Sequence, residues 1–186
     1  RQAILVLQGK PTTGQPNFKN AREALIVLIH LVGDLHQPLH VGAVYLNEHG
    51  RRVDPDKTGF RRNTFTVGGN SLWVSGAKAV PVKLHASWDA VPAQLKPARV
   101  DAAWLATARS VQRDTGEPAD WPVRWGTQAL EQARHAFEGM KFSERQGDRW
   151  EVELPLGYEA RAADIKRLQL TRAGARLAQL LQSIRP

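Results

Sequence analysis

The stretch His30-Leu31-Val32-Gly33-Asp34-Leu35-His36-Gln37-Pro38-Leu39-His40 gathers three imidazoles and one carboxylate in a short apolar segment. His30 and Asp34 are four residues apart, so a helix places both side chains on one face, one turn apart. A lone histidine on an apolar helix is usually a hydrogen-bonded core residue. Here the pair lies in a stretch that we predict to be buried, where an imidazole and a carboxylate are costly unless they are paired or bind a metal, which favours a metal.

Pro38 divides this motif. Proline lacks an N–H and disfavours helical backbone at the preceding residue, so we expect the helix to end before it. A continuous helix would place His40 far from the face that carries His30. A turn at Pro38 instead allows His40 to approach the same centre from another direction.

The segment Lys83-Leu84-His85-Ala86-Ser87-Trp88-Asp89 repeats the four-residue spacing of histidine and aspartate. One such pair is a weak signal, because it also occurs as a simple surface contact, but two pairs with an additional histidine are stronger. The donor set suits zinc and exceeds what one tetrahedral ion needs. Clustered metals favour hydrolysis of phosphate esters. We therefore predict a metal cluster bound by His30, Asp34, His40, His85 and Asp89.

These motifs resemble the signature of the S1/P1 nucleases, which are zinc-dependent, single-strand-preferring nucleases and 3′-nucleotidases. The eleven-residue motif is followed by Gly68-Gly69-Asn70 and by Leu84-His85-x-x-Trp88-Asp89, in the family's order and local spacing. The segment before Gly68 is longer than is usual in the family. The C-terminal run from Tyr158 to Ala178 also fits. The resemblance implies a single helical domain of the phospholipase C/P1 nuclease type over residues 1–186.

The resemblance also implies a cofactor of three zinc ions. It assigns His30 and Asp34 to one zinc, with Asp34 bridging to another, and it assigns a complete site to His40, His85 and Asp89. Asp34 and Asn70 are the catalytic candidates, and Asn70 would contact the substrate phosphate. The expected products carry a 5′-phosphate, released by a metal-activated water.

The sequence differs from the family pattern upstream of His30, because the family's remaining zinc ligands have no counterpart there. Residues 2–8 are also predicted to be the end of a helix, so the sequence begins within that helix. We therefore expect the chain to lack the N-terminal portion of the domain. In that case one zinc site is complete, and little cleavage is expected.

The formal net charge is +8, which suits a polyanionic partner such as single-stranded nucleic acid. We predict an exposed basic loop over residues 47–62, in which Arg61 and Arg62 bind the phosphate backbone; an ordinary solvated loop is the alternative. Tyr45 and Leu46 are candidates for a base pocket. His36 is predicted to be structural or to support a ligand, and the tryptophans to be core residues.

Elsewhere the pattern predicts a mainly α fold with one small β-hairpin. Helices are expected from Ala21, capped by Asn20, to about Gly33, then over 84–91, 100–113 and 122–142, with a last helix that contains Ile165 to Ile184. Strands are expected over 64–67 and 71–74, joined by Gly68-Gly69-Asn70. No apolar run reaches the ~18 residues of a membrane span.

Three alternatives stay open. A zinc-dependent phospholipase C shares the fold, but Asp89 and Trp88 favour the nuclease. A catalytically inactive, zinc-stabilised domain that binds nucleic acid is the second, and a structural domain with buried His–Asp hydrogen bonds is the third. Zero cysteines exclude thiolate ligands. By resemblance we expect a secreted or periplasmic monomer.

Overall fold

The computed structural model describes residues 1–12, 14–75 and 80–184. Two compact units make up the chain: residues 1–36, 94–129 and 167–186 form the first, and residues 37–93 and 130–166 form the second. The early turns of α7 (Trp121–Ala136) belong to the first unit, as do the late turns of α8 (Tyr158–Ile184). One domain over 1–186 stays a prediction, whereas the mainly helical class is confirmed.

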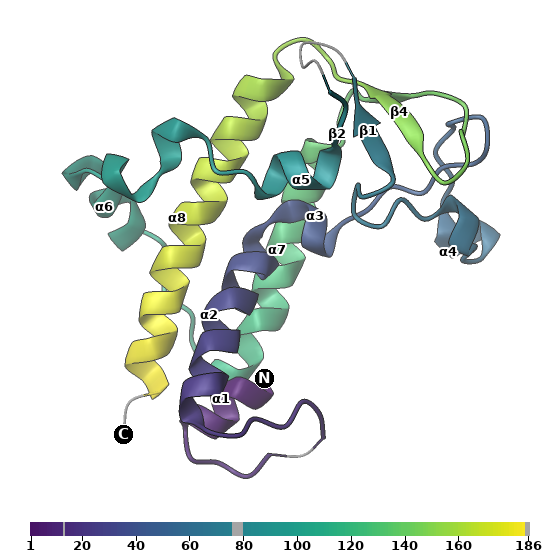
Figure 1. Cartoon of the computed structure of the whole chain (residues 1–186). Helices are drawn as coiled ribbons and strands as arrows, with labels where there is room; N and C mark the ends of the chain where they lie inside the picture. The colour runs from purple at the N-terminus through teal and green to yellow at the C-terminus, as the bar shows by residue number, and fades with distance from the viewer. Residues whose placement is uncertain (13, 76–79, 185–186) are drawn as a thin grey trace. The chain divides into compact units, whose positions relative to one another are not determined.

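The first unit contains α1 (Gln2–Leu7), α2 (Ala21–His36), η3 (Pro97–Arg99), α6 (Ala102–Arg109) and η4 (Pro118–Asp120). Figure 1 shows α1 beside the first turns of α2. The side chain of Asn20 accepts a hydrogen bond from the Glu23 N–H at 2.9 Å, which confirms the predicted cap. The helix continues three residues past Gly33, to the residue before Gln37, where Pro38 makes further helix unfavourable.

Only one stripe of α2 is buried, so the prediction that this apolar stretch is buried holds for one face of the helix and is wrong for the rest. Ala24, Leu28 and Val32 recur every four residues and are buried. Ile26 and Leu31 are 57% and 50% exposed. The stripe packs in a core with residues of α1, η4, α7 and α8, namely Ala3, Ile4, Ala119, Trp121, Trp125 and Leu180.

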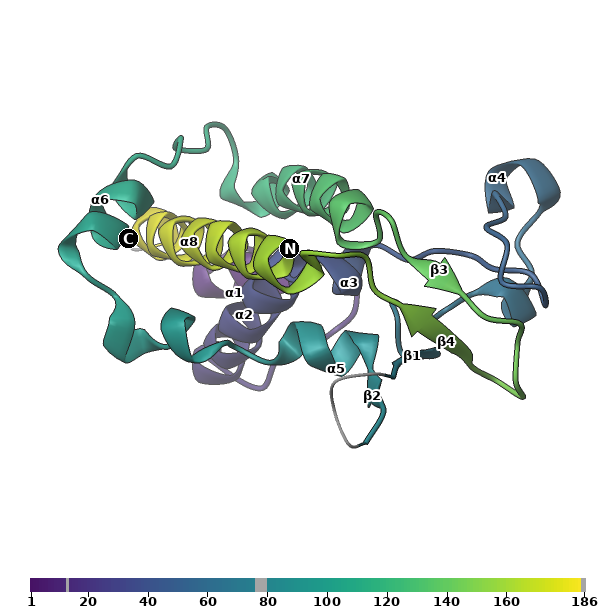
Figure 2. The same ribbon diagram turned by 90° about the horizontal axis from the view of Figure 1, so that it is seen from above.

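The second unit contains α3 (Pro38–Val41), α4 (Pro55–Thr58), η1 (Arg62–Thr64) and α5 (Leu84–Asp89), together with a four-stranded sheet. A short 3-10 turn, η2 (Ala93–Leu95), follows α5 and contains the boundary between the two units, after Ala93. Figure 2 shows the sheet in the order β2 (Val82–Lys83), β1 (Leu72–Val74), β4 (Trp150–Glu153) and β3 (Lys141–Phe142). The central β1–β4 pairing is parallel, and both outer pairings are antiparallel.

The predicted hairpin is corrected in its first strand. Strand 71–74 is confirmed as β1, but β1 pairs with β2 and β4 rather than with residues 64–67. Residues 64–67 form the end of η1 and one isolated bridge between Phe65 and Tyr45. The backbone of this segment forms its hydrogen bond with another part of the chain, since Thr64 O accepts the Leu46 N–H at 2.8 Å. The residues 68–70 form a turn, as predicted.

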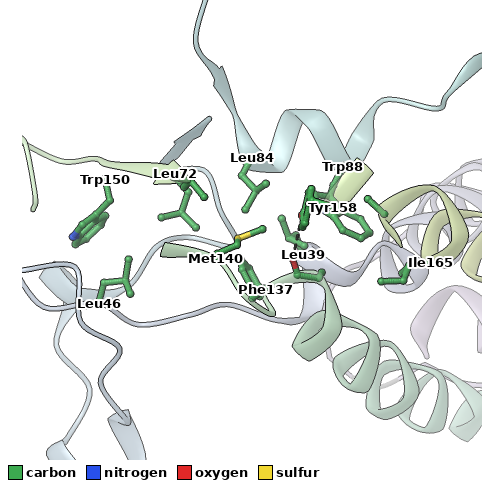
Figure 3. Packing of buried hydrophobic residues seen from close by; sticks show 13 residues of the cluster. Leu39, Leu46, Leu72, Leu84, Trp88, Phe137, Met140, Trp150, Tyr158 and Ile165 are labelled. Carbon is green, nitrogen blue, oxygen red and sulfur yellow. Dashed lines mark hydrogen bonds between the residues drawn. The ribbon is translucent and has the colours of Figure 1, made fainter. Parts of the chain in front are cut away.

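The core of the second unit lies between the sheet, α5 and the neighbouring turns of α7 and α8. Figure 3 shows Leu39, Leu84 and Met140 gathered at its centre, with Trp88 beside Tyr158. Leu46 is fully buried here, so the expectation that it lines a base pocket is wrong. The predicted core role is confirmed for five tryptophans: Trp88, Trp104, Trp121, Trp125 and Trp150.

The remaining helix ends shift for local reasons. The helix predicted over 122–142 ends at Ala136, because Gly139 takes a positive φ of 73° and residues 141–142 join the sheet. Asp101 caps α6 by accepting the Trp104 N–H at 2.8 Å. Within the described ranges, no helix is long and apolar enough to cross a membrane.

A buried hydrogen bond joins α8 to α2 in the first unit. Arg176 is 7% exposed, and its Nη1 donates to the Nε2 of His36 at 2.9 Å. The His36 Nδ1 then donates to Val32 O at 2.7 Å, so both ring nitrogens are satisfied. Burial lowers the pKa of His36 to about 4, which keeps the ring neutral near pH 7. These contacts give His36 a structural role, as predicted.

We predict that Arg176→Met lowers the free energy of unfolding by about 1–3 kcal/mol, because the buried His36 Nε2 loses its donor. Arg109→Met, on an exposed residue of α6, is the matched control and should change it by less than about 0.5 kcal/mol. Chemical denaturation of the three proteins tests this. Equal losses in both variants would contradict a specific role for the contact.

Candidate metal centre

Two imidazoles and a carboxylate meet in the second unit. His40 comes from α3, while His85 and Asp89 lie four residues apart on α5, as the spacing predicted. His40 Nε2 lies 3.4 Å from Asp89 Oδ1, and His85 Nε2 lies 3.6 Å from Asp89 Oδ2. One ligand atom from each of the three residues lies within 4.8 Å of the other two. We call His40, His85 and Asp89 the metal triad.

The spacing of the triad fits a shared ion better than direct hydrogen bonds. Good N–H···O hydrogen bonds are about 2.7–3.2 Å long, which is shorter than both nitrogen–oxygen distances. Zinc–ligand bonds of about 2.0–2.2 Å place two ligand atoms of a tetrahedral site roughly 3.3–3.6 Å apart. The two distances of 3.4 and 3.6 Å, which end on the two different oxygens of Asp89, fall in the range of such ligand–ligand separations.

One side of the triad is open to solvent. The His85 side chain is 15% exposed, His40 is 32% exposed and Asp89 is 49% exposed. Structural zinc sites close all four positions with protein ligands, whereas catalytic sites keep one for water or substrate. Three protein ligands with an exposed side have the form of a catalytic site.

The family comparison agrees with this geometry. The S1/P1 Nuclease family model matches residues 3–185. The chain belongs to the S1/P1 nuclease family. A search of curated proteins and a search of solved structures each returned no significant match.

In this S1/P1 chain the turn of residues 67–70 sets the orientation of one ligand. The His85 Nδ1 donates to Gly68 O at 2.8 Å, so its Nε2 is left for the metal. The His85 N–H also donates to Gly69 O at 3.3 Å. Gly68 has a φ of 57°, and a Cβ added there would lie 2.2 Å from Leu39 O. Only glycine fits between the two ligand-bearing helices at this point.

Gln37, which sequence reasoning missed, connects the other two ligands. Its side-chain oxygen accepts the Leu39 N–H and caps α3, next to His40. Its Nε2 donates to Asp89 Oδ1 at 2.9 Å. One amide group thus fixes the helix that carries His40 and the carboxylate of Asp89. Its position before Pro38, where helix caps are common, was the available signal.

The first turns of α8 support α5 from behind. Lys166 Nζ donates to Ser87 O at 2.6 Å and to Ala90 O at 2.8 Å, where carbonyls at the end of α5 lack helical partners. Trp88 Nε1 donates to the Tyr158 hydroxyl at 2.8 Å. Burial raises the pKa of Tyr158 to about 12. These contacts join residues distant in sequence, so no local pattern predicted them.

The second predicted ligand pair belongs to the first unit. His30 Nε2 lies 3.1 Å from Asp34 Oδ2 on α2, which confirms the predicted shared face. The side chains are 71% and 32% exposed, so the expectation of a buried pair is wrong. The reason is that they lie on the face of α2 opposite the stripe of Leu28 and Val32. Their metal role stays a prediction.

The predicted substrate contacts lie in the second unit. Asn70 is half-buried, and its Nδ2 donates to Val67 O at 3.1 Å. Arg61 and Arg62 are exposed, and the predicted basic loop is largely exposed, including the short helix α4 within it, which has no buried residue. His49 and His135 are exposed and pair with nearby glutamates. The structure does not test the substrate roles, which stay predictions.

We predict that Gln37→Met weakens zinc affinity about 10- to 100-fold, because Asp89 loses its donor and α3 loses its cap. Gln94→Met, at an exposed glutamine, is the matched control. Competition with a zinc-sensitive dye measures the affinity, and circular dichroism measures helix content. Unchanged affinity in Gln37→Met would show that the amide does not orient the carboxylate.

We predict that Gly68→Ala largely abolishes zinc binding, because the added methyl group would displace Leu39 from its place beside His40. Gly59→Ala isolates the cause: Gly59 has a φ of 78°, but nothing lies within 4 Å of an added Cβ. Both variants carry the backbone strain, and only Gly68→Ala carries the steric clash. Equal zinc affinities in the two variants would contradict the close approach.

Proposed function

We propose that this chain is a zinc-dependent endonuclease and 3′-nucleotidase that hydrolyses phosphodiester bonds of single-stranded DNA and RNA, with 5′-phosphate products. The observation that carries the proposal is the metal triad with its open side. Membership of the S1/P1 nuclease family supports the same reaction class over residues 3–185. We extend the family's secretion or export to this chain by the same resemblance.

The donor set fits zinc. Two imidazole nitrogens and one carboxylate oxygen form a frequent ligand set of catalytic zinc, whereas magnesium prefers oxygen ligands alone. When bound, zinc supplies a Lewis acid that polarises a phosphoryl oxygen and lowers the pKa of water. Two further ions would involve His30 and Asp34, as the family resemblance implies.

The protein's own residues hold the ligands in place before a metal arrives. Gly68 O holds the His85 ring by its Nδ1, and Gln37 holds the Asp89 carboxylate by its Oδ1. Such preorganisation reduces the conformational entropy lost on binding. The contact with Gly68 leaves Nε2 of His85 facing the triad. Both oxygens of Asp89 lie beside a triad imidazole, Oδ1 at 3.4 Å from His40 Nε2 and Oδ2 at 3.6 Å from His85 Nε2.

We propose roles for three polar residues in substrate binding and catalysis. Asn70 donates one amide hydrogen to Val67 O, which leaves the second for a phosphate oxygen. Arg61 and Arg62 attract the phosphate backbone, and the net charge of +8 supports association with polyanions. Asp34 is the proposed catalytic carboxylate on α2.

The experiment is to measure zinc per chain and cleavage of a single-stranded oligonucleotide on the same sample, for wild type, His85→Ala and His135→Ala. We expect wild type to bind zinc at the triad. His85→Ala should lose that zinc, together with any cleavage that wild type shows, because a two-ligand site binds zinc weakly. His135 is exposed on α7 and outside the triad, so His135→Ala should match wild type.

Other outcomes identify the alternatives. Zinc without cleavage, but with salt-dependent binding of the oligonucleotide, would favour an inactive nucleic-acid-binding domain. Hydrolysis of a choline phospholipid would favour a phospholipase C. A melting temperature unaffected by a chelator, with no zinc bound, would favour a purely structural domain.

A further inference from the structure

Three aromatic rings cluster on the second unit, outside the metal triad. Tyr45 and Phe65 stack with centroids 5.4 Å apart and planes 26° from parallel. Phe60 meets both rings at 6.2 Å, in edge-on geometry. We call Tyr45, Phe60 and Phe65 the aromatic patch. Phe60 is 63% exposed, although a phenylalanine ring gains most when buried.

The patch rests on a fixed backbone. Tyr45 and Phe65 face each other in an antiparallel bridge. The Thr66 hydroxyl donates to Val44 O at 2.7 Å, and the Leu46 N–H donates to Thr64 O at 2.8 Å. The backbones that carry the Tyr45 and Phe65 rings are therefore fixed to each other by hydrogen bonds. A ligand that stacks on them meets a preformed surface and loses little additional conformational entropy on binding.

Positive charge borders the patch. Arg61 and Arg62 directly follow Phe60 and are exposed. Within the described parts of the chain, neither guanidinium has an ion pair with a carboxylate at 4.0 Å or less. By contrast, Lys57 on the neighbouring α4 pairs with Asp54 at 3.6 Å. Two unpaired guanidinium groups suit phosphate oxygens, which they bind in bidentate geometry.

The patch lies within reach of the metal triad. Phe65 is three residues before Gly68, so their Cα atoms are at most about 11 Å apart. Gly68 O in turn contacts the His85 ring at 2.8 Å. Figure 2 shows α4, which precedes Phe60 in the chain, standing away from the sheet in this unit.

We propose that the aromatic patch, with Arg61 and Arg62, is a base-stacking site for single-stranded nucleic acid beside the metal centre. Unpaired bases present their faces to aromatic rings, whereas the bases of a duplex are already stacked on each other. The guanidinium groups bind the phosphates of the same strand. The choice of ligand rests on the proposed function, but the site itself lies on the segment that is longer than usual in the family.

The test measures binding rather than cleavage. Fluorescence anisotropy follows a labelled oligothymidylate, and an abasic strand of equal length supplies the same phosphates without bases. Both are titrated with chelator-treated protein, so that cleavage does not interfere, after circular dichroism has confirmed that each variant is folded. We expect wild type to bind the oligothymidylate more tightly than the abasic strand.

The variants separate stacking from charge. Phe60→Ala and Phe60→Leu should each weaken oligothymidylate binding about 5- to 100-fold and leave binding of the abasic strand unchanged. Phe60→Trp should restore the affinity, because it restores an aromatic face. Arg61→Gln with Arg62→Gln should weaken binding of both strands and reduce the salt dependence by about two phosphate contacts. Leu156→Ala, at a fully exposed apolar residue, is the control.

Equal affinity of Phe60→Ala and wild type for oligothymidylate would overturn the proposal, as would equal affinity of wild type for the two strands. Neither result depends on hydrolysis. A protein that binds as expected but cleaves nothing would retain the stacking site and lose the proposed function. A protein that cleaves but shows no base-dependent binding would retain the function and lose the stacking site.

Discussion

The close approach of Gly68 to Leu39 and His85 is the constraint on which the second unit depends. A side chain at Gly68 would collide with the Leu39 carbonyl, so the turn can pass between α3 and α5 only as glycine. The same residue uses its carbonyl to orient the His85 ring. Formation of the 67–70 turn therefore also orients the His85 imidazole, because the same residue, Gly68, forms the turn and contacts the ring.

The residues next to this contact position the other members of the triad. Leu39 and Leu84 enter the core on either side of the turn, and their sequence neighbours His40 and His85 are carried to the triad. Gln37 joins the start of α3 to Asp89. The apolar core fixes the backbone next to His40 and His85, and polar contacts hold the side chains of His85 and Asp89, so the ligands are positioned without a metal.

Sequence reasoning succeeded where the information is local. The four-residue spacing on α5, the cap at Asn20 and the break at Pro38 each depend on neighbours within one turn of helix. Sequence reasoning failed where segments distant in the chain compete for the same backbone hydrogen-bonding groups. Residues 64–67 have strand composition, but Leu46 takes their backbone acceptor, and β1 pairs in parallel with β4, almost eighty residues later. Long-range pairing of this kind leaves no periodic signal.

The exposed face of α2 shows the same limit. An apolar composition around the helix predicted full burial, yet burial depends on which elements pack against each side, and only the stripe through Leu28 has such neighbours. The argument that His30 and Asp34 need a metal to offset burial therefore loses its premise. What supports a metal in this chain is the triad, where the distances between ligand atoms fall in the range of zinc ligands, and where Gly68 O and Gln37 hold the side chains of His85 and Asp89.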